Sequence, residues 1–361
     1  MAVSIGDRAV GDGNPCFITF EAGPTHSGLK SAKRLTRLAA EAGADAIKFQ
    51  MLDADRLVAD KEKPFSYGIL ADRESGRVET KTESLYEILK RRELEPAEWR
   101  ELAEYAHDLG IAFFCTACFE DEIDLLCEIG CQSIKIASAD INHLPLIRHA
   151  ARTGLCIQLD TGSSTIGEVE RAVDAILAEG NEQIIIHHCP SGYPARLESI
   201  NLRVIPTLKR MFEDIPIAFS DHTPGWEIDI AALALGANLL EKTITEDRMT
   251  PLVEHVMSLE PDEMQTFVRT IREVETGLGH ARRLMSEKER ESGKAVRRSA
   301  YARQDIAPGS TITEADIEYR RPGDGIPPDL HDMLLAATPK RRIKAGEKLH
   351  WSLLHIENGR K

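Results

Sequence analysis

The sequence lacks the features that direct a protein to a membrane or to nucleic acid. No apolar run approaches the ~20 residues that a membrane-spanning helix needs, so we predict no membrane segment. Lysine and arginine number 45 against 59 aspartates and glutamates, and the formal net charge is −14 at pH 7. Binding to a phosphate backbone needs a basic face, so this charge argues against a nucleic-acid partner.

Cysteine is scarce, and the first residues lack the pattern of a secretory signal peptide. The chain has seven cysteines, an odd number. Most lie in or beside predicted strands, where cysteine behaves as a small apolar residue. We therefore expect reduced thiols and a cytoplasmic protein.

Short apolar runs, in contrast, recur eight times in the first 245 residues, separated by stretches with helical periodicity. This alternation predicts an α/β fold, the (β/α)8 TIM barrel. Its active site lies at the C-terminal ends of the strands, so the polar residue after each run is a candidate site residue. The predicted strands are 17–20, 46–49, 111–115, 133–136, 156–159, 183–186, 216–219 and 238–240.

The pattern divides the chain into three parts. Residues 1–279 form the predicted barrel, and the highly charged residues 280–295 suit an exposed helical linker. Residues 296–361 contain short predicted strands at 299–302 and 317–319. A β-rich unit of this size is marginal alone, so we expect it to pack on a barrel.

The segment 52–93 interrupts the barrel rhythm. It is long, charged and poor in aliphatic residues, which indicates a loop. Long loops in compact domains are usually lids or binding loops, and this one follows the second strand, at the active-site face. Solvated decoration is the alternative interpretation.

Two lysines lie within predicted barrel strands. Alternation along the strands points Lys48 and Lys135 toward the barrel axis. Buried lysines require anions, so the pair predicts a site for a carboxylate or phosphate. A Schiff-base lysine and side chains that extend to the rim are the alternatives.

The run Ser-Asp-His-Thr closes the seventh predicted strand. Ser220 could donate to a phosphate, and His222 could ligate a metal. Alternatively, Asp221 or Thr223 caps the next helix.

Other candidate groups close the sixth and first predicted strands. Of His187 and His188, alternation points one inward. Glu21 closes the first strand, where it could bind substrate hydroxyls or act as an acid or base.

With these motifs in place, the chain resembles the sialic acid synthase family across nearly its whole length. The tail resembles the antifreeze-like (SAF) domain of the same enzymes. The matching motifs are Glu-Ala-Gly-Pro-Thr-His-Ser-Gly at 21–28, Gly-Ala-Asp-Ala-Ile-Lys-Phe-Gln at 43–50, Lys-Ile-Ala-Ser at 135–138, His-Cys-Pro-Ser-Gly-Tyr-Pro at 188–194, Ser-Asp-His-Thr at 220–223, and Arg-Arg-Pro-Gly-Asp-Gly-Ile at 320–326.

The resemblance implies condensation of phosphoenolpyruvate with an amino-sugar aldehyde of the N-acetylmannosamine type. Glu21 is the first candidate for proton transfer at the acceptor. A domain-swapped homodimer is implied, with Arg321 reaching the sugar from the partner's tail. The implied phosphoenolpyruvate contacts are Lys48, Thr116, Lys135, Ser138, Ser191 and Ser220. The implied sugar contacts are Glu21, Gln50, Asp140, Tyr193 and Glu254.

Three residues depart from the family pattern. Asp160 stands where the family usually has serine, and it belongs beside the substrate only if it faces a cation or the sugar. Glu254 replaces an aspartate. Thr243 replaces one of two histidines that hold a divalent metal, Mn²⁺ or Mg²⁺. His222 alone binds such an ion weakly, which puts the metal in doubt unless His187 or His255 substitutes.

We therefore predict a nonulosonic (sialic) acid synthase that forms a carbon–carbon bond and releases phosphate. A related synthase with a legionaminic- or pseudaminic-type acceptor is one alternative. A Schiff-base aldolase and a degenerate synthase that only binds sugar are the others.

Overall fold

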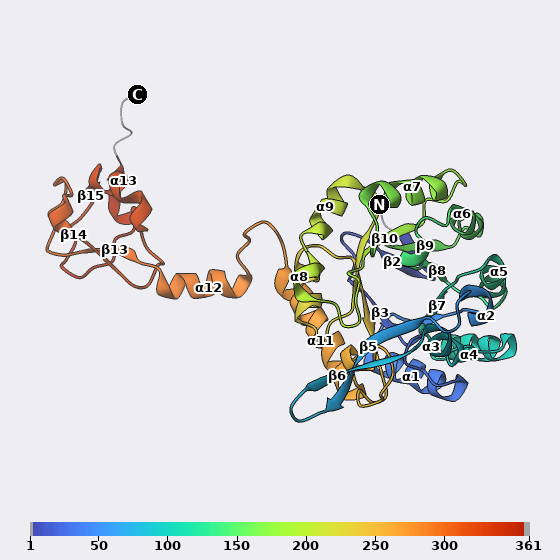
Figure 1. Cartoon of the computed structure of the whole chain (residues 1–361). Helices are drawn as coiled ribbons and strands as arrows, with labels where there is room; N and C mark the ends of the chain where they lie inside the picture. The colour runs from blue at the N-terminus through green and yellow to red at the C-terminus, as the bar shows by residue number, and fades with distance from the viewer. Residues whose placement is uncertain (1–2, 357–361) are drawn as a thin grey trace. The chain divides into compact units, whose positions relative to one another are not determined.

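The computed structural model describes residues 3–356 and divides the chain into two compact units, Met1–Gly279 and His280–Lys361 (Figure 1). Among the described residues, no helix has the length and apolar character needed to cross a bilayer.

The first unit is a closed barrel of eight parallel strands, as the sequence predicted. Each predicted run overlaps a strand to within one residue, and in seven strands the first polar residue after the run belongs to the strand. Both faces are covered, so the strands are almost continuously buried. The strands, in barrel order, are β3 (Phe17–Glu21), β4 (Ala46–Gln50), β7 (Ala112–Thr116), β8 (Ser133–Ile136), β9 (Cys156–Asp160), β10 (Ile184–His188), β11 (Ile217–Asp221) and β12 (Leu239–Thr243).

Amphipathic helices surround the barrel. In α1, the buried Ala32, Leu35 and Ala39 form the predicted apolar stripe, and Gly43 ends the helix in the left-handed conformation at φ 85°. The helices are α1 (Leu29–Ala42), α4 (Pro96–Asp108), α5 (Glu120–Glu128), α6 (Leu144–Arg152), α7 (Ile166–Leu177), α8 (Leu197–Ile200), α9 (Val204–Met211), α10 (Glu227–Ala234) and α11 (Pro261–Leu278), with 3-10 turns η1 (Ser138–Asp140) and η2 (His255–Met257). A small hairpin that the sequence did not predict, β1 (Val3–Ile5) with β2 (Arg8–Val10), precedes the barrel.

The segment after β4 is not the long loop expected from the sequence. It contains α2 (Ala54–Leu57), the antiparallel strands β5 (Pro64–Asp72) and β6 (Arg77–Ser84), and α3 (Leu85–Lys90). Tyr67, Ile88 and Val253 form its small apolar core. Most other hairpin side chains are at least partly exposed, so the strands lack the apolar alternation by which strands are recognised.

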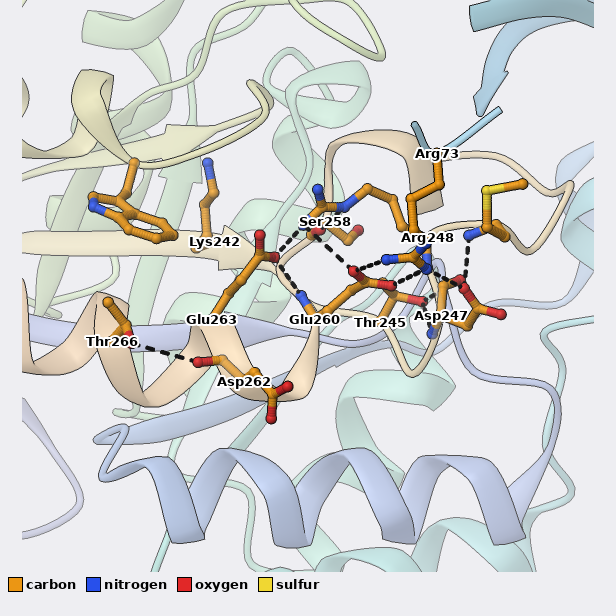
Figure 2. A network of polar contacts seen from close by, with 12 residues as sticks. Arg73, Lys242, Thr245, Asp247, Arg248, Ser258, Glu260, Asp262, Glu263 and Thr266 are labelled. Carbon is orange, nitrogen blue, oxygen red and sulfur yellow. Dashed lines mark hydrogen bonds and ion pairs between the residues drawn. The ribbon is translucent and has the colours of Figure 1, made fainter. Parts of the chain in front are cut away.

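A network of polar contacts connects the hairpin to the loop between β12 and α11 (Figure 2). Arg73, at the hairpin turn, donates to Glu260 at 2.6 and 2.7 Å and to Asp247 at 2.9 Å. These hydrogen bonds to Arg73 lower the pKa of Glu260 to about 2. Lys81 also donates to the carbonyl oxygen of Pro251, at 2.9 Å. The hairpin is thereby held against the loop that carries Glu254.

The second unit begins with the exposed helix α12 (Glu287–Val296) and contains two small antiparallel sheets. Strands β13 (Ser299–Ala302) and β14 (Ile317–Arg320) confirm the two predicted strands, and β15 (Ala337–Pro339) pairs with β16 (Leu354–Ile356). Its other short elements are α13 (His331–Leu335), η3 (Glu314–Asp316), η4 (Pro328–Leu330) and η5 (Trp351–Leu353). Its separate apolar core includes Ile306, Ile343 and Leu349.

Candidate active site

A cavity of about 630 Å³ lies at the C-terminal ends of the barrel strands, where the sequence predicted the site. Ten predicted site residues line it: Glu21, Lys48, Gln50, Thr116, Ser138, Asp140, Asp160, Tyr193, His222 and Glu254. Residues of the 52–93 segment form part of its wall. The barrel therefore brings together side chains separated by more than two hundred positions in the sequence.

Glu241 joins the two barrel lysines at the base of this cavity. Lys48 Nζ donates to Glu241 Oε1 at 2.8 Å, and Lys135 Nζ donates to Oε2 at 2.7 Å. Glu21 also pairs with Lys48, and Asp160 Oδ1 lies 3.0 Å from Lys135 Nζ. Both lysines face inward as predicted, and Asp160 faces a cation, which explains an acid at this position. Each buried charge therefore has a partner of opposite sign.

The charges in this group shift each other's pKa. Burial opposes ionisation of Glu241, but Lys135 and Lys48 hold its pKa well below the usual range. Burial also disfavours the charged form of Lys48, but Glu21 and Glu241 raise its pKa well above the ordinary value. Burial raises the pKa of Glu21. At neutral pH, Lys48 is consequently an ammonium group and not a free amine.

A fully buried polar layer lies around Lys135. Its Nζ also lies 3.2 Å from both Ser220 Oγ and His187 Nδ1. The other His187 ring nitrogen lies 2.8 Å from Gln158 Oε1. His188 points outward and donates from Nε2 to the carbonyl oxygen of Ile200. One histidine of the pair faces inward, as predicted, and both of its ring nitrogens have protein partners.

His222 lines the cavity beside Tyr193. Its Nδ1 donates to the carbonyl oxygen of Pro190 at 3.0 Å, and its ring centroid lies 4.8 Å from that of Tyr193. Its Nε2 makes no hydrogen bond to the described residues. This nitrogen is free to contact a substrate.

The residues on either side of His222 do not cap the next helix. Helix α10 begins at Glu227, beyond Asp221 and Thr223, so the capping interpretation was wrong. Asp221 instead accepts from the Thr223 hydroxyl and from Lys242, which also lies 3.3 Å from Asp229. This buried ion group fixes the turn that carries His222.

The donor set does not fit a resident divalent metal. Thr243 closes β12 and pairs in register with Glu21, and its side chain supplies no imidazole. His255 does not line the cavity, and its Nδ1 lies 2.7 Å from Thr245 Oγ1. Across residues 3–356, no three His, Cys, Asp or Glu side chains are grouped so that they could hold a metal ion.

Three further polar residues that line the cavity are Glu254, Asp140 and Arg92. Glu254 has a left-handed backbone at φ 70°, and burial raises its pKa to about 7. Burial also raises the pKa of Asp140. Arg92, which follows α3, is only 5% exposed, and its Nη1 donates to Gln50 Oε1 at 3.4 Å. Arg92 was not predicted from the sequence.

Four predicted residues do not line the cavity. Lys135 and Ser220 lie in the buried layer described above. Ser191 is exposed, and its hydroxyl lies 2.8 Å from that of Ser163. Arg321 is an exposed residue of the second unit.

Sequence reasoning listed Glu241 only as the polar residue after the eighth run, with no role, and it missed Arg92. A strand continued by one residue beyond 240 would have pointed Glu241 inward beside the lysines. For Arg92 no local pattern indicated a cavity residue. Its position depends on the fold of the whole 52–93 segment.

A (β/α)8 barrel with paired lysines and carboxylates beneath a cavity defines a barrel enzyme that handles anionic substrates. The chain belongs to the NeuB family, whose model matches residues 35–283, and residues 297–355 match the SAF domain. It is therefore a phosphoenolpyruvate-dependent nonulosonic acid synthase, a transferase.

Individual relatives support the same assignment. The chain is 35% identical to N,N'-diacetyllegionaminic acid synthase from Legionella pneumophila, over 98% of both chains. It is 33% identical to human N-acetylneuraminate-9-phosphate synthase, over 89% of this chain and 88% of that protein. The solved structure of an N-acetylneuraminic acid synthetase from Leptospira borgpetersenii aligns with a TM-score of 0.70 at 32% identity, over 81% of this chain and 95% of that one.

Proposed function

We propose that this synthase joins C3 of phosphoenolpyruvate to the aldehyde carbon of an open-chain 2-acetamido sugar. The observation that carries the proposal is the group formed by Lys48, Lys135 and Glu241 at the base of the cavity. The Lys48 ammonium group lines the cavity and is suited to an anionic oxygen of phosphoenolpyruvate, while Lys135 lies in the buried layer beneath the cavity. Thr116 and Ser138, which line the same cavity, are placed to donate to these oxygens.

The reaction then balances in three steps. The enol carbon attacks the aldehyde, the new carbon–carbon bond forms, and the aldehyde oxygen takes up a proton. Water adds to the resulting cation at C2 and releases a proton. Phosphate then leaves with cleavage of the bond between its bridging oxygen and C2, the C2 hydroxyl gives its proton to the departing phosphate, and the ketone of the product forms.

Two carboxyl groups can serve these proton transfers. Glu254, with a pKa of about 7, carries its proton in about half of the molecules at pH 7, and we assign protonation of the aldehyde oxygen to it. Glu21, the first candidate from the sequence, accepts from the Gly23 amide and pairs with Lys48. It remains the alternative donor and is placed to accept the proton that the attacking water releases.

We further propose that the reaction does not require a resident divalent metal. The proposal rests on the donor set, in which Thr243 supplies no imidazole and His222 is the only histidine among the described residues that line the cavity. His222 instead contacts the substrate through Nε2. Activity that is unchanged after exhaustive chelation supports this, and activity restored specifically by Mn²⁺ or Mg²⁺ overturns it.

The raised pKa of Lys48 argues against the Schiff-base alternative, because an amine must be uncharged to attack a carbonyl. Treatment with pyruvate and borohydride separates the two mechanisms. A covalent adduct on Lys48 or Lys135 would establish the aldolase.

A homodimer in which Arg321 of one chain reaches the sugar bound by its partner remains a proposal from the family resemblance. Exposure of Arg321 is consistent with it. Sedimentation gives the oligomeric state. Mixing an Arg321→Ala chain with a Lys48→Met chain tests the swap, since active mixed dimers form only if each site uses both chains.

The seven free cysteines support our further proposal of a cytoplasmic enzyme.

The decisive experiment is incubation with phosphoenolpyruvate and a panel of 2-acetamido sugars, with detection of phosphate and a nonulosonic acid. We expect both products with at least one sugar. No phosphate release with any sugar contradicts the proposed function. The panel also identifies the acceptor among the sialic, legionaminic and pseudaminic types.

A further inference from the structure

The 52–93 segment places an arginine in the cavity wall without an adequate partner. Arg92 is 5% exposed, yet its side chain makes a single hydrogen bond to the described residues, the 3.4 Å contact with Gln50. No carboxylate of the described residues lies within 4 Å of it. A guanidinium group has five N–H donors, and a long hydrogen bond to one of them leaves most of this capacity unused.

Two carboxylates surround Arg92 at longer range. Burial lowers the pKa of Arg92, while Glu254 and Glu21 oppose this shift. A phosphate group placed against Arg92 would also meet these two acidic side chains. A neutral carbonyl or hydroxyl oxygen accepts from the guanidinium without that repulsion.

The same segment supplies an apolar surface. Its residues Leu57, Val58, Phe65, Ile88 and Leu89 line the cavity, together with Val253 of the loop between β12 and α11. Such a surface favours methyl or acyl-methyl groups, because their burial removes apolar area from water. Lys63 and Asp60, which also line the cavity, bring charges of opposite sign.

We propose that Arg92 is a specificity-determining residue that binds a carbonyl or hydroxyl oxygen of an uncharged amino-sugar acceptor, with the adjacent apolar wall taking its methyl-bearing substituents. This inference rests on the proposed function. It identifies the substrate class as an acylamino sugar without phosphate, preferably one with deoxy or additional acylamino positions.

The test compares steady-state kinetics with three acceptors: N-acetylmannosamine, its 6-phosphate, and a 2,4-diacetamido-2,4,6-trideoxyhexose. For the intact enzyme we expect kcat/KM to be at least about tenfold higher with the better uncharged sugar than with the phosphate. In Arg92→Leu, loss of the charged donor should raise the acceptor KM about 10- to 100-fold. The KM for phosphoenolpyruvate should change less than about twofold.

Arg91→Leu is the matched control, because Arg91 is the adjacent arginine but donates to Glu83 in the hairpin and does not line the cavity. We expect its kinetics to match the wild type. If Arg92→Leu does not fold, Arg92→Lys keeps the charge and should give an intermediate rise in acceptor KM.

Each remaining result contradicts the inference. If the intact enzyme prefers the phosphorylated sugar and Arg92→Leu loses this preference, Arg92 binds an anion. Equal changes in both KM values, or no change in either, would make its role structural. Failure of the intact enzyme to release phosphate with any acceptor instead contradicts the proposed function, so the two failures are distinguishable.

Discussion

Glu241 and Lys135 form a buried ion pair, with Glu241 Oε2 2.7 Å from Lys135 Nζ, at the base of the candidate active site. The other oxygen of the same carboxylate accepts from Lys48. One side chain of β12 thus sets the spacing between a lysine of β4 and a lysine of β8. The stability of the barrel and its affinity for an anion depend on the same carboxylate.

Glu241→Gln should therefore destabilise the protein while keeping its shape. Removing one partner of a buried ion pair leaves uncompensated charge and typically costs about 3–5 kcal/mol in the free energy of unfolding. Chemical denaturation at pH 7 measures this loss. Glu213→Gln, an exposed position on the same unit, is the control and should change stability little.

The stability difference should depend on pH. The folded pKa of Glu241 is lowered, so its contribution is fully present above the unfolded value of ~4.3 and is lost as pH falls toward the folded value. The difference in the free energy of unfolding between the wild type and Glu241→Gln should narrow below about pH 4. A gap that stays constant through the acid range would contradict this assignment of charge.

Most of the barrel could be predicted from the sequence because its strands are buried on both faces, which produces continuous apolar runs. Inward alternation also placed Lys48 and Lys135 correctly. Glu241 was given no role because the eighth run was ended at residue 240, although β12 continues to Thr243.

The 52–93 segment could not be predicted in the same way. Strands β5 and β6 bury few side chains, so they lack the apolar alternation that identifies a strand. Arg92 reaches the cavity only because this segment folds back over the barrel. Long-range placement of this kind leaves no local signal in the sequence.

The pH dependence of catalysis should identify the proton donor. Burial raises the pKa of Glu254 to about 7, so its proton is present below that pH and lost above it. If Glu254 protonates the acceptor oxygen, kcat/KM falls above about pH 7, and Glu254→Gln both removes this limb and lowers the rate by about 10²- to 10⁴-fold.

Glu254→Asp and Glu21→Gln complete this experiment. In Glu254→Asp, which keeps a carboxyl group, kcat/KM should still fall at high pH, but at a shifted pH. In Glu21→Gln the limb should persist, because Glu254 is intact. If the limb instead disappears with Glu21→Gln and survives in Glu254→Gln, Glu21 is the donor.

Binding of phosphoenolpyruvate should take up protons. Burial already raises the pKa of Glu21, which pairs with Lys48, so an arriving trianion raises it further. Titration calorimetry at pH 7 in buffers of different ionisation enthalpy should show net uptake. Glu21→Gln should reduce the uptake. Equal binding enthalpies in all buffers would show that the carboxylates keep their charge.

The contacts of Arg73 should affect the KM for the acceptor and not the overall stability of the protein. Arg73 and its partner Asp247 are exposed, so Arg73→Ala should change the melting temperature only slightly. The hairpin it holds leads into α3 and Arg92, and its strand β5 contributes Phe65 to the cavity wall. Loosening it should raise the acceptor KM several-fold and leave the KM for phosphoenolpyruvate unchanged. Arg77→Ala is the control, because Arg77 pairs only with Glu79 within the hairpin. If both variants raise the acceptor KM equally, the effect comes from the hairpin itself and not from the contacts of Arg73 with Asp247 and Glu260.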